Sequence, residues 1–132
     1  MFLDTNVLVS AFTARGLCAD LLRLVLAEHE LLTGEVNLAE LRRILADRFH
    51  ATPQQVQVVE DQLREHTIVP RPDVPSRLTI RDPDDAWVLA SASNGQAELL
   101  VTGDQDLLTV ADRAPIPIVS PRAAWERLRG AP

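Results

Sequence analysis

Short apolar runs alternate with longer segments of helical periodicity along the chain. Apolar runs bounded by polar or turn residues predict strands at 1–3, 31–33, 67–69, 99–102 and 116–119. Apolar positions at helical spacing predict helices over about 19–28, 38–49, 53–66, 83–93 and 120–128, with a short helix following 103–106. This alternation predicts an α/β fold, a single three-layer domain over residues 1–132 with a mainly parallel central sheet flanked by helices.

Polar and turn residues predict where several of these elements begin and end. Asp82 followed by Pro83 is typical of a helix start, with the aspartate as N-cap and the proline at the first helical position. Three prolines within 70–75 exclude regular strand pairing and predict an irregular connector. The first apolar run is expected to form a short buried strand that turns at residues 4–6.

Composition fits one globular domain and excludes several chemistries. The chain has 132 residues, of which 46% are hydrophobic and 24% are charged, and all 13 basic residues are arginine because the sequence contains no lysine. This absence excludes the lysine of a nucleotide-binding P-loop and a Schiff-base lysine. It also removes the lysine that aspartyl-phosphate enzymes and phosphate-receiver domains usually need.

The charge balance and the single cysteine constrain partners and location. The net charge of −6 argues against nucleic-acid binding through a general basic surface, so a nucleic-acid substrate would have to be gripped locally. Cys18 alone cannot form an internal disulfide or a cysteine metal site. Neither a charged-then-apolar leader nor a long apolar run is present, and we therefore expect a cytoplasmic protein without membrane association.

Four acidic residues are predicted to meet at one edge of the sheet. Asp4 and Asp104 directly follow apolar runs, and ligands of open parallel sheets bind beyond the carboxyl ends of the strands. Asp85 falls on the inward stripe of its helix, whereas Asp84 is turned about a third of a circle away. Glu40 lies at the margin of the apolar stripe of its helix and is expected to reach the same side.

Each of these acids also has a structural interpretation. Asp4 and Asp104 can serve as turn or capping residues, and residues 82–85 suit the positive end of a helix dipole. Glu40 follows Asn37 by three residues, which is the spacing of a capping box.

The four acids taken together favour a metal site. Four carboxylates in one crevice would repel one another and raise their own pKa values unless a cation neutralised them. Oxygen ligands alone favour Mg²⁺ or Mn²⁺. The three histidines lie on segments predicted to be exposed helix flanks and receive no metal role: His29, His50 and His66.

Four blocks of sequence, in this order, resemble PIN-domain ribonucleases. They are FLDTNVLVSA from residue 2, LAELRRIL from residue 38, DPDDA from residue 82 and LVTGDQDLL from residue 100. The likeness is strongest to the toxin components of bacterial toxin–antitoxin pairs, the VapC-like group, and spans nearly the whole chain. It implies a catalytic and metal-binding quartet with three supporting polar residues. The quartet is Asp4, Glu40, Asp85 and Asp104, and the supporting residues are Asn6, Thr102 and Asp106.

The resemblance implies metal-assisted hydrolysis of RNA phosphodiester bonds with one or two Mg²⁺ or Mn²⁺ ions. It also implies an antitoxin partner and a homodimer, for which apolar residues within 21–26 or 56–63 are candidate surfaces. Because lysine is missing, arginine is expected to contact the phosphate. Arg81 is the first candidate, and Arg15 and Arg43 are weaker ones.

Two other functions remain open at this stage. A catalytically inactive PIN-like interaction module would hold a basic segment of a partner in its acidic crevice. An aspartate-based phosphatase or receiver-like domain would share the strand-then-Asp4 start. That chemistry lacks its lysine here, and its second aspartate is replaced by Asn6.

Overall fold

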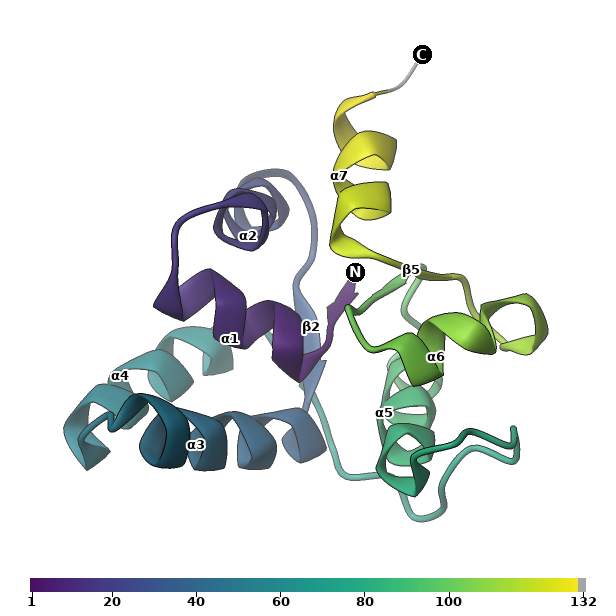
Figure 1. The fold of residues 1–132 in the computed structure, drawn as a ribbon, viewed down its shortest axis with the longest axis horizontal. Coiled ribbons are helices and arrows are strands. Elements are labelled where there is room, and N and C mark those ends of the chain that lie inside the picture. The colour runs from purple at the N-terminus through teal and green to yellow at the C-terminus, as the bar shows by residue number, and fades with distance from the viewer. Residues whose placement is uncertain (131–132) are drawn as a thin grey trace.

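A five-stranded sheet in which all neighbouring strands are parallel forms the centre of the protein (Figure 1). The computed structural model describes residues 1–130. The strands are β1 (Phe2–Leu3), β2 (Leu32–Gly34), β3 (Thr67–Val69), β4 (Leu100–Val101) and β5 (Ile118–Val119), arranged in the order β3-β2-β1-β4-β5. The predicted α/β class is confirmed, and the sheet is wholly rather than mainly parallel.

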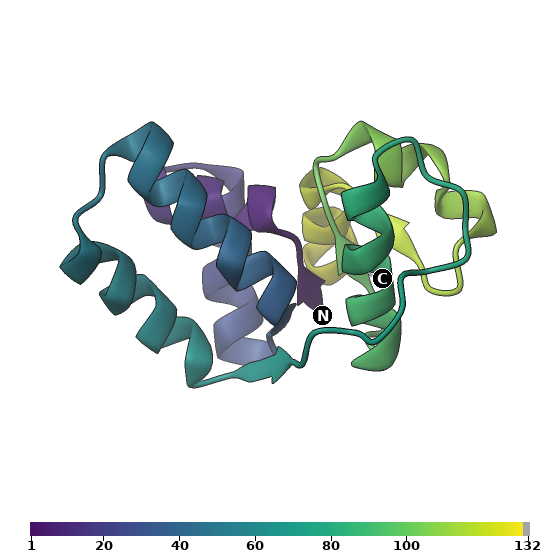
Figure 2. The same ribbon diagram turned by 90° about the horizontal axis from the view of Figure 1, so that it is seen from below.

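Helices cover both faces of this sheet (Figures 1 and 2). The helices are α1 (Thr5–Thr13), α2 (Leu17–Glu28), α3 (Glu35–Phe49), α4 (Pro53–Arg64), α5 (Pro83–Asn94), α6 (Gln105–Thr109) and α7 (Pro121–Arg129), with a 3₁₀ turn, η1, at Ala111–Arg113. None of the helices described over residues 1–130 has the length and apolar character needed to cross a bilayer.

Neighbouring residues of the short strands supply two separate cores. Leu3 and Val101 pack in the core formed with α1 to α4 and α7, whereas Phe2 and Leu100 pack in the core formed with α5 and α6. All four side chains are fully buried. Side chains of successive strand residues point to opposite faces, so even two-residue strands serve both layers. This explains why the strands are apolar without alternation.

The segment after Asp4 forms a helix, where the sequence predicted only a turn at residues 4–6. Asp4 follows β1 and is the N-cap of α1. Its Oδ1 accepts a hydrogen bond from the Thr5 amide at 2.7 Å. Val7, Leu8 and Val9 look strand-like in sequence, yet all three are buried against the helical layer. Tertiary packing therefore overrides the weak strand preference of β-branched residues.

The helix starts predicted at Pro53 and Pro83 are confirmed. Asp82 caps α5 with Pro83 in its first turn, as predicted. Thr52, directly before Pro53, forms a reciprocal capping box with Gln55 at the start of α4. The prediction for 70–75 is also correct, because this stretch contains neither helix nor strand. Such capping interactions involve residues within a single helical turn and can therefore be predicted from the sequence.

The apolar segments suggested as dimer surfaces lie largely in the core. Leu21, Leu22 and Val25 of α2 are buried, as is Leu63 of α4. Leu26 remains 44% exposed, and Val58 of α4 is also exposed. Helical periodicity identifies an apolar face without revealing what covers it.

The strand order creates a crevice beside the end of β1. The chain moves from β1 outward to β2 and β3, and then returns to place β4 on the other side of β1. Such a reversal of direction is the place where open α/β sheets bind ligands. Asp4 follows β1 and Asp104 follows β4 after a two-residue gap, so both lie at this point.

Candidate metal centre

Asp4 is buried at the end of β1 and is hydrogen-bonded through both carboxylate oxygens. Its Oδ1 accepts from the Thr5 amide at 2.7 Å and from Asn37 Nδ2 at 2.9 Å. Its Oδ2 accepts from Thr102 Oγ1 at 2.7 Å and from Asn6 Nδ2 at 3.2 Å. Burial raises the pKa of this carboxyl, and the nearby Asp104 charge acts in the same direction, while the hydrogen bonds oppose the shift.

Asn6 and Thr102, predicted as supporting residues, connect the ends of β1 and β4. Asn6 Nδ2 also donates to Thr102 Oγ1 at 3.2 Å, and its Oδ1 accepts from the Gly103 amide at 2.8 Å. Thr102 Oγ1 in turn accepts from the Asp104 amide at 3.0 Å. This network fixes the loop after β4 relative to Asp4, so the two acids are held in a defined relation before any ligand binds.

Asp104 is held at the start of α6, where it meets two further aspartates. Its Oδ1 accepts from the Asp106 amide at 2.9 Å, which makes it the N-cap of α6. One carboxylate oxygen from each of Asp85, Asp104 and Asp106 lies within 4.8 Å of the others. Asp104 is therefore both a cap and a member of the cluster, so the two interpretations of this residue do not exclude each other.

Asp106 belongs to this three-residue cluster, although the sequence suggested only a supporting place for it. It lies two residues after Asp104, in the first turn of α6, and is half-buried. Asp4 and Glu40 lie outside the cluster, so the four predicted acids do not all converge to ligand spacing. Asp104 and Asp106 are two residues apart at the start of α6, and the turn of the helix there brings their carboxylates together. The prediction considered only the end of the preceding strand, which identifies Asp104 alone.

Asp85 carries an unsatisfied carboxylate oxygen. Its side chain is only 6% exposed, and Oδ2 is buried without a hydrogen-bond partner. Burial, followed by the adjacent Asp104 carboxylate, raises the pKa of Asp85 to about 8. The neighbouring Asp84 is exposed, in keeping with the helical phase predicted from the sequence. The free oxygen is ready to accept a cation or a proton.

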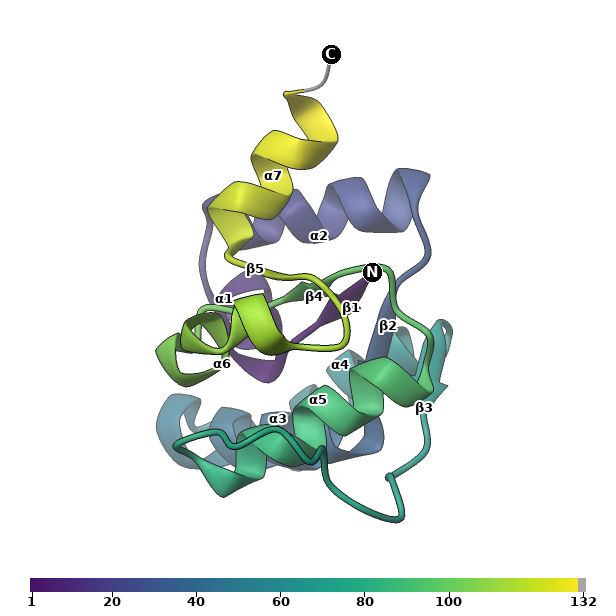
Figure 3. The same cartoon turned by 90° about the vertical axis from the view of Figure 1, so that its right-hand side faces the viewer.

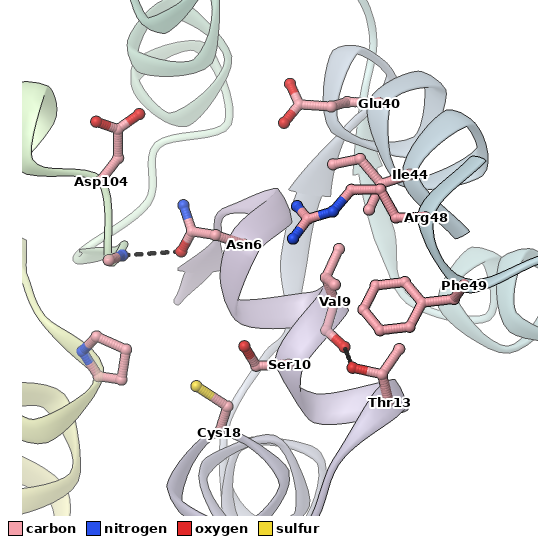
Figure 4. Close-up of a pocket in the computed structure, with 12 residues that line it drawn as sticks. Asn6, Val9, Ser10, Thr13, Cys18, Glu40, Ile44, Arg48, Phe49 and Asp104 are labelled. Atoms are coloured by element: carbon pink, nitrogen blue, oxygen red, sulfur yellow. Dashed lines mark hydrogen bonds between the residues drawn. The ribbon is translucent and has the colours of Figure 1, made fainter. Parts of the chain in front are cut away.

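Glu40 faces the crevice from α3. It is half-buried, and its pKa is raised by burial and then by the charge of Asp4. It lines a cavity of about 540 Å³ together with Asn6 and Asp104, and Figure 4 shows Glu40 and Asp104 on opposite sides of Asn6. The capping-box interpretation is wrong, because α3 begins at Glu35 and Asn37 lies inside the helix.

Asn37 is a site residue that the sequence did not reveal as one. It is fully buried and donates from Nδ2 to Asp4 Oδ1 and, at 3.0 Å, to Thr5 Oγ1. Because it lies one turn before Glu40 on α3, it joins the helix carrying one acid to the loop carrying another. The sequence could have indicated this role for Asn37, because a polar residue beside Leu38 on the buried face of a helix needs a hydrogen-bond partner.

The predicted phosphate-binding arginines are distributed unevenly around the site. Arg43 lines a second cavity of about 370 Å³ that also includes Glu40. Arg81 and Arg15 line neither of the two cavities that share Glu40. Of the three candidates, Arg43, one of the two weaker ones in the sequence, is thus the one placed beside Glu40.

The residues present suit a hard divalent cation. Clustered carboxylates with one buried, unpartnered oxygen supply the oxygen ligands that Mg²⁺ and Mn²⁺ prefer. Within residues 1–130, the side chains that come close enough together to share a metal ion are all aspartates. The three histidines are exposed, as predicted.

Comparisons with known proteins identify a family and a shared fold. A family model described as PIN domain matches residues 1–106. A chain of VapBC2 from Rickettsia felis, in a crystal structure with a DNA fragment from their promoter, has a TM-score of 0.61 and 18% identity. That alignment covers 90% of this chain and 96% of the other.

A second solved structure shows the same degree of likeness. A chain of a toxin–antitoxin complex from Klebsiella pneumoniae has a TM-score of 0.61 and 22% identity, with 91% of this chain and 96% of that chain covered. None of the curated proteins compared matches the chain. At these identities the structures establish the shared fold, while the family match extends over most of the sequence. The protein belongs to the PIN domain family.

Proposed function

We propose that this protein is a metal-dependent ribonuclease that hydrolyses RNA phosphodiester bonds. The observation that supports this most directly is the cluster of Asp85, Asp104 and Asp106 beyond the end of β4, in which Asp85 keeps one buried carboxylate oxygen without a hydrogen-bond partner. These three aspartates, with Asp4 and Glu40 beside them, would hold one or two Mg²⁺ or Mn²⁺ ions. Membership of the PIN domain family favours this activity over the phosphatase or receiver interpretation.

The chain's own residues have distinct parts in this proposal. When bound, the divalent ion lowers the pKa of a coordinated water and offsets the charge of the scissile phosphate. Asp85 and Asp104 would supply carboxylate oxygens from the cluster. Asp4 is held in place by four hydrogen bonds and would add a third carboxylate to the centre. Asn6 and Thr102 keep the loop bearing Asp104 in place, so little reorganisation accompanies binding.

Asp104→Asn tests the activity without removing the helix cap. Asparagine is as good an N-cap as aspartate, so α6 should keep its start while the charge disappears. We expect the wild type to cleave single-stranded RNA with Mn²⁺ or Mg²⁺ and to lose this activity in EDTA. The variant should not cleave the RNA even with the metal present. Asp112→Asn, at an exposed acid in η1, is the matched control and should cleave normally. Equal cleavage by the Asp104 variant would disprove the assignment.

We further infer that the nuclease is the toxin of a toxin–antitoxin pair that acts on cytoplasmic RNA. The support is the likeness to chains of two such complexes over nearly the whole length of this chain. Its partner would be a small antitoxin, and the active form would be a homodimer. Expression of the wild type should arrest growth, and Asp4→Asn should relieve the arrest. Arrest that persists with Asp4→Asn would count against a nuclease toxin.

A further inference from the structure

A groove beside the acidic cluster combines an aromatic ring with two arginines. The cavity of about 370 Å³ lies between α3 and α5 and is bordered by the connector that precedes α5. Figure 3 shows this connector running alongside α5. Glu40 lines both this cavity and the larger one that reaches Asp104, so the two hollows meet at one acid of the candidate centre. The groove therefore borders the candidate centre at Glu40.

Arg71 lies over Trp87 at the wall of this groove. The guanidinium carbon is 4.9 Å from the centroid of the indole ring. Arg71 stands between Pro70 and Pro72, and Pro72 is buried, so the backbone that carries the guanidinium is restricted to extended geometry and anchored. The Ser76 amide donates to the Ala86 carbonyl at 2.9 Å and ties the following part of the connector to α5. The backbone beneath Arg71 is thus held against α5, and the exposed guanidinium is presented from there to the Trp87 ring.

The arginines of the groove are available for an anion. Across the described residues 1–130, neither Arg43 nor Arg71 forms an ion pair, whereas Arg42 and Arg64 are paired with glutamates. The groove also contains Glu40 and Asp84, which balance the two positive charges. Glu40 lies toward the metal centre and Asp84 is exposed. An anion is therefore favoured only in the part of the groove next to the arginines.

We propose that Arg71, Trp87 and Arg43 form a subsite for an unpaired nucleotide that flanks the scissile phosphate of single-stranded RNA. This inference rests on the proposed ribonuclease activity. An unpaired base stacks on aromatic rings and on guanidinium planes, and the forked donors of arginine match a phosphate. A base within a duplex has both faces covered and cannot use the stacked pair. The subsite selects single strands in a protein whose overall charge is −6.

Binding measured apart from cleavage tests the subsite. The probe is a short, labelled, single-stranded oligoribonucleotide in EDTA, followed by fluorescence anisotropy. We expect Arg71→Ala to weaken binding about tenfold, the scale of losing one stacked base. Arg71→Lys should recover part of the loss, because it restores the charge but not the plane. Arg77→Ala, an exposed arginine of the same connector outside the groove, is the control and should bind as the wild type does.

Cleavage kinetics separate the subsite from the activity itself. In Mn²⁺, Arg71→Ala should raise KM about tenfold and leave kcat nearly unchanged, because the lost contact is a binding contact. If the wild type cleaves RNA and Arg71→Ala matches Arg77→Ala in both assays, the subsite is wrong and the nuclease stands. If the wild type binds the single strand through Arg71 but cleaves nothing, the nuclease is wrong and the subsite stands.

Two competitors define what the groove recognises. A duplex of the same sequence should compete poorly with the labelled strand, and equal competition would overturn the proposal. Poly-glutamate represents an acidic protein segment. If Arg71→Ala weakens the binding of poly-glutamate and leaves RNA binding unchanged, the groove belongs to an acidic partner and the nucleotide subsite is rejected.

Discussion

Asn37 donates a hydrogen bond of 2.9 Å from Nδ2 to Oδ1 of Asp4, and so links α3 to the end of β1. Both residues are buried, and the same amide reaches Thr5 Oγ1. The contact spans 33 positions of sequence and ties the helix that carries Glu40 to the deepest acid of the site. Asn37 therefore positions Asp4 rather than acting on a substrate.

Asn37→Ala should weaken both the fold and the site. Removing the donor leaves Asp4 Oδ1 with the Thr5 amide alone, and loss of a hydrogen bond to a buried carboxylate costs about 1–3 kcal/mol. The free energy of unfolding, measured by urea denaturation, should fall by that amount, and cleavage should slow. Asn94→Ala, at the exposed end of α5, is the control and should stay within about 0.5 kcal/mol of the wild type. An unchanged urea midpoint for Asn37→Ala would contradict this role.

Asp4→Asn should abolish cleavage and keep the fold. The substitution removes a buried charge that lies near Asp104, which relieves both desolvation and repulsion. The new amide nitrogen would replace Oδ2, to which Thr102 Oγ1 and Asn6 Nδ2 now donate, so the hydrogen bonds lost there offset this gain. We expect a melting temperature in EDTA close to that of the wild type, with no cleavage above background. Normal cleavage in a preparation free of contaminating nuclease would show that Asp4 is dispensable.

Asp85→Asn and Asp84→Asn should separate the two adjacent aspartates by metal response. Free Mn²⁺ at one hundred times its Kd should stabilise the wild type by about 2.7 kcal/mol, which appears as a higher melting temperature. The Asp85 variant should lose most of this shift, since it removes one of the three clustered carboxylates. The Asp84 variant should keep the shift, because that side chain is exposed. A shift lost in the Asp84 variant instead would reverse the assignment.

Without metal, the protein should become less stable as pH rises from about 4 to 8. Asp85 has a pKa of about 8 in the folded state, against 3.8 for an ordinary aspartate. Between these values the folded state holds a proton that the unfolded state has released, so the free energy of unfolding decreases with pH. The raised pKa values of Asp4 and Glu40 act in the same direction.

Thermal unfolding at pH 5 and pH 8 measures this dependence. In EDTA the melting temperature should be lower at pH 8 than at pH 5, and Asp85→Asn should reduce the difference. Saturating Mn²⁺ should also reduce it, because carboxylates that bind metal lose their protons. A stability in EDTA that rises between these two pH values would rule out a protonated cluster.

The sequence by itself determined the features of this protein that depend on residues close together in the chain. The caps at Asp82 and Asp104 act within one helical turn, and the alternation of apolar runs with periodic segments sets the α/β class. Helical phase alone distinguished Asp85 from Asp84, because a step of one residue turns a side chain by about 100°. These features depend on neighbours in the chain, and the sequence carries them directly.

Contacts between distant segments were decided only by the tertiary structure. Packing made a helix of the strand-like residues after Asp4, and the strand order brought the ends of β1 and β4 together. Asn37 became a partner of Asp4, and Arg71 met Trp87, because separate elements placed them side by side. Sequence spacing records which residues follow one another, whereas these relationships depend on which buried faces pack together.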